Sequence, residues 1–597
     1  MKYIGELEEL KSALKSLNGD WEQLNPNQHQ FRSHSGGIIN WYPSTGTIAF
    51  QGKNQPKGEL ITAVRCLIDT DADTTKHHTV DNHPTSNDQD QISNTEISNE
   101  FLGGQYCDSE LIIGLVGAVG TDLSQVIRAM TERLKHMGYT SHEIRISKDI
   151  IAELAENQIG GNDEYERISR FMDAGNLLRK KSKDCSILAL GAAAKINEQR
   201  EQQKPRRRYA YIINSLKHPE EVARLREIYS EGFFLLGVHS DKKRRHEYLK
   251  ENKQIPKSKA AALINRDADE ELSDHDNNAY GQQTRDTFHL ADFFIHLDKN
   301  TDKIQNGIWR VIDLIFGHPY TTPTFDEYAM FMAFAAALRS ADLSRQVGAV
   351  VAKDNMILST GANDCPKYGG GLYWPSYDEQ HSKISDAEDG RDYMRGEDSN
   401  KTEKNNIIES LMDLLKDHTS DPEKVHAVLK KSKIKDITEY GRVVHAEMEA
   451  ILSCARSNIC AKGATLYCTT FPCHNCAKHI IAAGIKRVVY IEPYPKSKAS
   501  EFHSDSISLN KKSNDTVLFE PFVGIGPQRF FDLFSMTFGF GNSLKRKDKA
   551  GQTIDWELGN NKLRVQMLPC SYIERETLAA SILSSYISIF NQGDGDG

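Results

Sequence analysis

Short apolar runs that alternate with amphipathic segments mark the first half of the chain as an α/β region. Four apolar runs have the length of a strand: 111–116, 209–214, 233–239 and 293–297. A turn with two glycines joins the first run to an amphipathic stretch that ends near His136, and residues 219–230 also have a helical pattern. Strands that alternate with helices predict a parallel sheet covered by helices, and we expect this domain to span residues 107–320.

Two shorter regions precede this domain. Residues 1–68 combine a helical pattern, from Ile4 to Leu17, with two alternating runs around the turn at 43–46. This is a hairpin signal, so we expect a small α+β domain. Residues 69–106 are rich in Asp, Asn, Ser, Thr and Gln and nearly lack apolar side chains. They predict a disordered linker, because such a segment cannot offset its ordering entropy.

The hairpin residues 42–52 resemble the small sheet appendage that binds substrate in some bacterial ribonucleases H. The likeness is short. Packing of Trp41 and Phe50 as core residues explains the same pattern, and both interpretations stay open.

In the C-terminal half, two predicted helices begin at residues with metal-binding side chains. One starts after His445, which two valines precede and an apolar helix face follows. The other starts after Cys473, between a strand pattern at 464–470 and a helix pattern at 477–484. At a helix N-terminus the positive end of the dipole favours a thiolate over a thiol.

The spacing of these residues matches the H-x-E and P-C-x-x-C pattern of zinc-dependent nucleobase deaminases. We expect His445, Cys473 and Cys476 to bind Zn²⁺ and to leave its fourth position open for water. Glu447 is the expected catalytic residue, a carboxylate that moves protons between that water and a ring nitrogen of the base. A structural zinc knuckle is the competing interpretation of Cys-x-x-Cys alone, and the flanking strand and helices argue against it.

The surroundings of the motif resemble the deoxycytidylate deaminase branch of the cytidine deaminase superfamily. Residues 344–363 are similar to the first hairpin of that branch, and residues 485–490 to the strand after its second zinc helix. The resemblance implies an αβα three-layer fold with a mixed sheet, here over residues 321–545. It also implies hydrolytic deamination of cytosine to uracil on a free deoxynucleotide, in which activated water attacks C4 while Glu447 transfers the proton to N3 and then to the leaving amine.

The same resemblance supplies two substrate-binding residues. Asn363 matches a position that contacts the sugar in the family, and Tyr494 would lie against the base. The alternative for Asn363 is a loop residue that tolerates a turn conformation.

The glycines after residue 116 indicate a phosphate-binding loop, because a strand, a glycine turn and a helix N-terminus direct backbone N–H groups at an anion. The expected nucleotide-binding residues are Gly117, Gly120, Thr121 and Ser124. However, Asp122 and Leu123 stand where the P-loop pattern has glycine and lysine, and the strand ending at Asn214 offers no obvious Walker B acid. We therefore expect a degenerate P-loop kinase-like domain that binds a regulatory nucleotide with Mg²⁺. An inherited fold used only for packing or assembly is the alternative.

Composition restricts the class of protein. The chain has 597 residues and ten cysteines, which is enough for about two to four domains and fits a reducing compartment. No run approaches the roughly 20 apolar residues of a membrane helix, and the N-terminus lacks a signal-peptide pattern, so we expect a cytoplasmic protein with no membrane partner. The net charge of −9 argues against a chain-wide nucleic-acid surface, although it allows a local basic patch.

A degenerate P-loop kinase-like domain before such a deaminase resembles the bacterial antiphage dCTP deaminases. Three further segments support the resemblance: 396–400, 492–497 and 519–527. It implies zinc-dependent conversion of dCTP, and also of dCMP, to the uracil forms, which depletes dCTP during phage infection. A nucleotide or RNA bound to the P-loop-like domain would regulate the reaction. The family tendency is to form homo-oligomers, with the apolar stretch 330–338 as one candidate packing face, and residues 546–597 are expected to form a C-terminal extension and a flexible tail.

Three other functions stay open. The N-terminal domain favours an editing deaminase that acts on RNA or single-stranded DNA, whereas the acidic charge and the lack of a broad aromatic and basic strip disfavour it. The others are a housekeeping dCMP deaminase and a non-catalytic nucleotide sensor, and the intact metal set with Glu447 argues against the sensor. The charged insert 377–440 is expected either to cap the pocket and contact phosphates or to be a mobile surface insertion.

Overall fold

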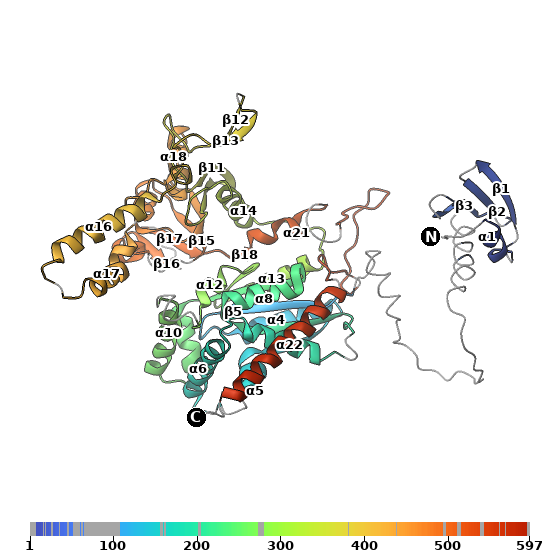
Figure 1. Ribbon diagram of the computed structural model, residues 1–597, viewed down its shortest axis with the longest axis horizontal. Coiled ribbons are helices and arrows are strands. Elements are labelled where there is room, and N and C mark those ends of the chain that lie inside the picture. Colours follow the sequence, from blue (N-terminus) through green and yellow to red (C-terminus); the bar gives the residue numbers. More distant parts are fainter. Residues whose placement is uncertain are drawn as a thin grey trace. The chain divides into compact units, whose positions relative to one another are not determined.

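A computed structural model describes residues 7–51, 60, 64 and 108–593, apart from short gaps (Figure 1). The gaps are 16, 18, 26–27, 35, 44–46, 156–158, 160, 162, 201–203, 273–279, 380, 419, 438, 493–496, 510–514, 538–542, 560 and 568. The chain divides into two compact units, Met1–Ser93 and Asn94–Gly597. The linker expected at 69–106 lies outside the described residues and stays a prediction.

In the described part of the first unit, a helix accompanies an antiparallel sheet. Its elements are α1 (Leu7–Ala13), β1 (Gly19–Asn25), β2 (Gln28–Ser33), β3 (Ile38–Tyr42) and β4 (Thr47–Gln51), and the strands pair in chain order. Trp41 is buried among Phe31 and Leu10, and Phe50 packs against the same cluster. These aromatic side chains therefore serve the core of the unit, which favours the packing interpretation of the hairpin.

The second unit contains two large sheets, of which the first has the strand order β18-β9-β8-β5-β7-β6. Its strands are β5 (Leu111–Gly117), β6 (Thr140–Arg145), β7 (Tyr209–Leu216), β8 (Phe233–Ser240), β9 (Phe293–Leu297) and β18 (Gly524–Ile525). All neighbours are parallel except β18 and β9. The predicted parallel sheet is therefore present, with the glycine turn after its central strand.

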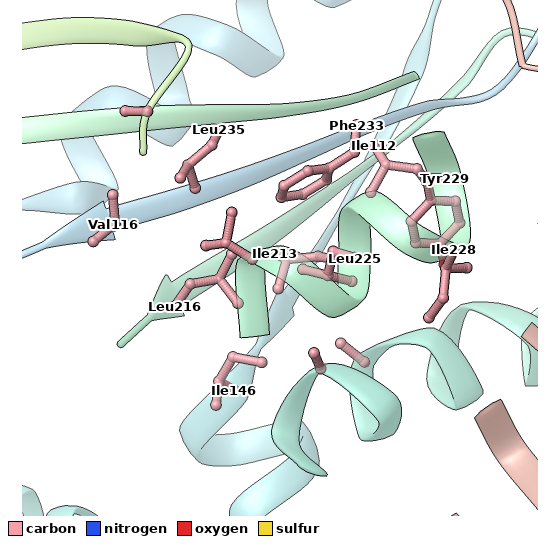
Figure 2. Packing of buried hydrophobic residues seen from close by; sticks show 14 of the residues in the cluster. Ile112, Val116, Ile146, Ile213, Leu216, Leu225, Ile228, Tyr229, Phe233 and Leu235 are labelled. Atoms are coloured by element: carbon pink, nitrogen blue, oxygen red, sulfur yellow. The ribbon is translucent and has the colours of Figure 1, made fainter. Parts of the chain in front are cut away.

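Helices cover both faces of this sheet. Alternate residues of β5 enter different cores, since Ile112 joins the core under α7 and α8 whereas Ile113 joins the core under α4 and α13. The first of these cores, with Ile112, Leu225 and Phe233, is seen closely in Figure 2. Because both faces are buried, the strands have the continuous apolar pattern of parallel sheets. The helical segments of this part are α4 (Leu123–His136), η2 (Ile146–Ile151), α5 (Ala152–Leu154), α6 (Glu164–Ser182), α7 (Ile187–Glu198), α8 (Pro219–Tyr229), η4 (Ser230–Gly232), α9 (Lys242–Glu251), α10 (Lys257–Leu272), α12 (Thr284–Phe288) and α13 (Thr301–Ile315).

The end of the chain returns to the first sheet. Helix α22 (Pro569–Gly593), drawn in red in Figure 1, packs along α7. Its buried residues Tyr572, Ala579 and Leu583 recur at helical spacing and join the same core as Ile112. The structure thus differs from the flexible tail expected within residues 546–597, because this apolar face is needed to cover α7.

The second sheet is mixed, with the order β11-β10-β14-β15-β17-β16. Its strands are β10 (Gly348–Lys353), β11 (Met356–Ala362), β14 (Thr465–Thr470), β15 (Arg487–Glu492), β16 (Ile507–Leu509) and β17 (Val517–Pro521). Helix α14 (Phe325–Ala337) packs on one face, and α18 (Ala446–Arg456) and α19 (His474–Ala482) pack on the other. The chain is therefore a mixed α/β protein in which helices cover both faces of each of the two large sheets. Met330, Ala333 and Ala337 are buried in this packing, so core burial accounts for part of the apolar stretch 330–338, whereas Leu338 is 60% exposed.

The remaining elements lie outside the two large sheets. They are β12 (Ser376–Asp378), β13 (Lys383–Ser385), α15 (Asp392–Arg395), α16 (Ser399–Leu415), α17 (Pro422–Lys431), η5 (Lys433–Asp436), α20 (Ala499–Phe502), η6 (Pro527–Arg529) and α21 (Phe530–Phe534). Among them, β12 and β13 pair in a separate two-stranded sheet. Among the described residues, no helix combines the length and apolar character needed to cross a membrane.

The segment after β17 joins the two sheets. Strand β18 pairs with the edge strand β9, and the Ile525 N–H donates to Glu327 Oε1 of α14 at 2.9 Å. Arg529 then donates to the Phe233 carbonyl oxygen at 2.8 Å and pairs with Asp292 at 3.3 Å. Residues near 525 therefore belong to the first sheet as much as to the second, although the expected division placed them in the domain 321–545.

Candidate active site

Three metal-binding side chains meet at the N-termini of α18 and α19. His445 and Cys473 are the N-cap residues, and Cys476 lies in the first turn of α19. His445 Nδ1 lies 3.4 Å from Cys473 Sγ and 3.3 Å from Cys476 Sγ. These separations suit a shared tetrahedral ion, because Zn–N bonds of about 2.0 Å and Zn–S bonds of about 2.3 Å place two donor atoms roughly 3.5 Å apart. The donor set thus fits Zn²⁺, the cofactor of this site.

The side chains of this cluster shift one another's pKa values. The pKa of Cys473 is lowered to about 4, first because the Cys476 thiol donates to its sulfur and then because His445 lies beside it. The contact with Cys473 raises the pKa of His445 to about 9. The surroundings of Cys473 therefore favour its thiolate form, whereas His445 must lose its proton when it binds a metal. Thiolate with neutral imidazole is a donor set that zinc prefers.

Glu447 lies in the first turn of α18 and is 4% exposed. Burial raises the pKa of its carboxyl group. It lines a cavity of about 410 Å³ together with His445, Cys473 and Thr470. A carboxyl group that takes up and releases a proton beside the metal ligands is what a proton shuttle requires.

Asn363 lines the same cavity, but its amide holds a loop. Its Oδ1 accepts from the Val347 N–H at 2.6 Å, and its Nδ2 donates to the Arg345 carbonyl oxygen at 2.8 Å. The structure therefore places Asn363 at the cavity and gives it the role of fixing the loop that carries Arg345. Tyr494, expected against the base, lies outside the described residues.

Two contacts with β11 set the position of helix α18. The Ser359 hydroxyl donates to the Ala450 carbonyl oxygen at 2.7 Å. Gly361 lies so close to the helix that an added Cβ would meet the Ala446 carbonyl oxygen at 2.2 Å. Helix α18 can approach β11 this closely only because residue 361 is a glycine. This close approach brings His445 and Glu447 to the cavity.

We expect Gly361→Ala to push α18 away and to lower both zinc occupancy and the free energy of unfolding, the latter by about 1–3 kcal/mol as for other overpacked sites. Zinc content and the melting temperature measure this. Gly307→Ala in α13 is a matched control, because its Cβ would only reach ordinary contact at 3.6 Å from Ile295. Full zinc occupancy in Gly361→Ala would contradict the expected role of this close approach.

The insert supplies cavity residues that the motif did not identify. They are Asp392, Asp398, Asn400, Lys404 and Lys435. The insert is held in place by Arg391, which is 4% exposed and pairs with Asp364 at 3.3 Å and Asp386 at 3.1 Å. Of the two expectations for the insert, this placement favours an insert that borders the pocket, and contact with phosphates stays a prediction. Only its mixture of lysine and carboxylate side chains hinted at this role.

The glycine turn after β5 lines a second cavity, of about 370 Å³, which includes all four expected residues, Gly117, Gly120, Thr121 and Ser124. Internal groups already use parts of this loop. The Val119 N–H donates to the buried carboxylate of Asp267 at 2.9 Å, and the Ser124 hydroxyl donates to Asp122. Lys217, which the sequence did not reveal as part of the site, donates to the Gly117 carbonyl oxygen at 2.7 Å. This lysine follows β7 and lies beside a loop whose own lysine is missing.

Comparisons with known proteins agree with the geometry of the first cavity. Residues 323–492, which contain His445, Glu447, Cys473 and Cys476, match the family of the cytidine and deoxycytidylate deaminase zinc-binding region. A deoxycytidylate deaminase of Enterobacteria phage T2 is 33% identical over 169 residues, which cover 28% of this chain and 79% of the phage protein. A deoxycytidylate deaminase of Schizosaccharomyces pombe is 25% identical over 352 residues, which cover 58% of this chain and 87% of that protein.

A solved structure also resembles part of the chain. It is a dCMP deaminase from cyanophage S-TIM5 in complex with dCMP and dUMP, with 20% identity and a TM-score of 0.20. The match covers 34% of this chain and 100% of that one.

Proposed function

Because this chain belongs to the deoxycytidylate deaminase family of zinc-dependent hydrolases, we propose that it deaminates dCTP, and also dCMP, to the uracil nucleotides in the cytoplasm. One observation supports this substrate class above others. The cavity that contains Glu447 and the metal ligands is also lined by Lys404 and Lys435. Lysine ammonium groups bind phosphates as point charges, so the same cavity suits a base and its phosphates.

The residues of the cavity have different roles in the proposed reaction. His445, Cys473 and Cys476 would hold the zinc ion, which supplies a Lewis acid that activates water. Glu447 would accept a proton from this water and donate it to N3 of cytosine while the water oxygen bonds to C4. It would then accept the remaining proton of that oxygen and donate it to the amino group, which leaves as ammonia while the C4 carbonyl of uracil forms. Its burial suits this task, since the raised pKa makes the carboxylate a stronger base toward the proton that it takes up.

The substrate class is tested by incubating the purified full-length protein with dCTP, dCMP, CTP and a cytosine-containing oligonucleotide, followed by assay of uracil products. We expect turnover of dCTP and dCMP. Turnover of dCMP without dCTP would instead show a housekeeping dCMP deaminase. Turnover of the oligonucleotide alone would overturn the proposal in favour of an editing enzyme.

We expect Lys404→Ala to raise KM for dCTP about tenfold or more, because a hydrogen bond to a charged group is worth about 1.5–3 kcal/mol. The KM for deoxycytidine, which carries no phosphate, should not change. Steady-state kinetics on both substrates measure the difference. Lys401→Ala is the matched control, because Lys401 is exposed on the same helix and does not line the cavity. An equal effect on deoxycytidine would show that Lys404 acts on the fold of the pocket.

The proposed role of the reaction is defence against phage. Loss of dCTP removes a precursor of DNA synthesis, so a phage that replicates in the cell would stall. The test compares intracellular dCTP after infection between cells that carry the wild-type chain and cells that carry Glu447→Ala. Equal dCTP levels would contradict the role in defence and leave the enzymatic proposal intact.

We further propose that the glycine turn after β5 binds a nucleoside triphosphate with Mg²⁺ that regulates the deaminase. The order of the parallel strands, with the turn after the central strand and a helix behind it, supports this proposal. The Asp267 carboxylate accepts a hydrogen bond from the Val119 N–H. A phosphate that binds this N–H group would therefore have to displace the carboxylate. This competition makes the loop suitable for a switch, because the internal anion and the ligand exclude one another.

We expect Gly120→Val to abolish regulation while the intrinsic deamination rate stays within about twofold of the wild type, as is usual for a substitution far from the reacting groups. Gly120 has a φ of +87°, and an added Cβ would lie 2.9 Å from the Arg245 carbonyl oxygen, so a side chain deforms the loop. Deamination of dCTP with and without Mg²⁺ and ATP, GTP or dTTP measures both quantities. If none of these nucleotides changes the wild-type rate, the proposed regulation by them is refuted.

A further inference from the structure

A second cluster of metal-binding side chains lies at the carboxyl ends of β8 and β9. His239, Asp241 and His296 each offer one ligand atom, and these atoms all lie within 4.8 Å of one another. The two strands are parallel, and His239 is the register partner of His296. Asp241 follows the last residue of β8 as the N-cap of α9, and its carboxylate lies beside both imidazoles. The backbone therefore places two imidazoles and a carboxylate side by side.

The separations within the cluster suit a shared ion. Nε2 of His239 lies 3.6 Å from Asp241 Oδ1, and Nε2 of His296 lies 3.5 Å from the same oxygen. Both distances exceed those of an ordinary N–H···O hydrogen bond. Two donors that each lie about 2.0–2.2 Å from one zinc-like ion are roughly 3.3–3.6 Å apart, which agrees with both distances.

The two imidazole Nε2 atoms are buried and have no hydrogen-bond partner among the described residues. A buried polar atom without a partner costs free energy, and a bound cation would supply the missing interaction. Beside the cluster, His239 lines a cavity of about 210 Å³ together with Arg285 and Tyr490. This space can hold water or an anionic group as a further ligand of the ion.

We propose that His239, Asp241 and His296 form a second metal site, which takes a divalent transition-metal ion such as Zn²⁺ or Co²⁺. Two imidazoles with one carboxylate are ligands for these ions and not for Mg²⁺, which prefers oxygen. The site is separate from His445, Cys473 and Cys476 and does not depend on the proposed substrate. It contains no thiolate, and this difference distinguishes the two sites by spectroscopy.

An ion at this place lies next to the sheet that carries the active site. Tyr490, which lines the adjoining cavity, belongs to β15. At the end of that strand Glu492 accepts from the Thr470 hydroxyl at 3.1 Å and pairs with Arg345 at 3.1 Å. Thr470 and Arg345 both line the active-site cavity. The second ion would therefore stabilise β8 and β9 where they face β15.

The test strips the full-length protein of metal, loads it with Co²⁺, removes excess ion by dialysis and measures metal content and absorption spectra. We expect two equivalents in the wild type and one in His296→Gln and in Asp241→Asn, with the thiolate-to-cobalt charge-transfer band intact. In Cys473→Ser/Cys476→Ser this band should vanish while one equivalent remains at the second site. His289→Gln, a histidine of the same domain outside the cluster, should keep two equivalents.

A wild type that binds a single equivalent would overturn the proposal, as would two equivalents in both His296→Gln and Asp241→Asn. The double cysteine variant leaves the cluster itself unchanged, so the test does not depend on the folding of a cluster variant. If this variant binds no Co²⁺ while its circular dichroism matches that of the wild type, the second site is likewise refuted.

Discussion

Replacing Glu447 with alanine should lower kcat by about 10²- to 10⁴-fold, the range that positioned general acid–base groups contribute. Zinc should stay bound, because His445, Cys473 and Cys476 remain. Since the buried carboxyl group already has a raised pKa, its removal should not destabilise the fold through a lost charge interaction. The measurements are dCTP turnover and zinc content of the same preparation.

Glu449→Gln is the matched control for this prediction. Glu449 lies one half-turn further along α18, is 7% exposed and pairs with Arg456. It does not line the cavity, so its replacement should cost stability and leave the rate per zinc-loaded enzyme near that of the wild type. Wild-type rates in Glu447→Ala would refute the role of Glu447. An equal loss in both variants would show that the rate depends on the helix and not on the proton shuttle.

Arg200→Met should destabilise the first sheet and its helices by about 3–5 kcal/mol, the usual cost of breaking a buried ion pair from one side. The Arg200 side chain is fully buried and lies between the carboxylates of Glu110 and Glu576. Tyr572 of α22 donates to Glu110 at 2.6 Å, so the same cluster attaches the terminal helix. Removal of the guanidinium leaves two carboxylates buried without a cation. Thermal unfolding measures the loss.

Arg170→Met provides the comparison. Arg170 forms an ion pair with Glu166, and the two side chains are 53% and 35% exposed. Such exposed ion pairs contribute at most about 1 kcal/mol to the free energy of unfolding. The triple variant with Arg200→Met, Glu110→Gln and Glu576→Gln should recover part of the stability, because no charge remains buried. A melting temperature of Arg200→Met equal to that of Arg170→Met would contradict the importance of the buried cluster.

The sequence predicted those elements whose pattern is local. Strands β5, β7, β8 and β9 are apolar because both faces of a parallel sheet are covered, and they were predicted within two residues of their bounds. Strand β6, with Thr-Ser-His-Glu at its start, was not predicted, because an edge strand that is half exposed has no apolar run. Helix α22 was also not predicted, because its apolar side chains pack against α7, which lies far away in the sequence.

The residues of the candidate site also differ in whether a local sequence pattern identifies them. The metal ligands and Glu447 could be named because zinc chemistry confines them to short motifs at two helix N-termini. The role of Lys404 depends on how the insert docks, which no local pattern encodes. The contact between Asp267 and Val119 joins residues 148 positions apart, so only the folded chain reveals that the phosphate-binding turn already holds an anion.

The return of the chain to its first sheet has a consequence for synthesis on the ribosome. Strand β18 and helix α22 complete that sheet and its helical layer, yet they are translated after the whole second sheet. At about 5–20 residues per second, β9 and α22 emerge on the order of tens of seconds apart. During that interval the nascent chain exposes the edge of β9 and the apolar surface of α7. Final closure of the first sheet must therefore wait until α22 has been made, so a domain that is begun before the second sheet is completed after it.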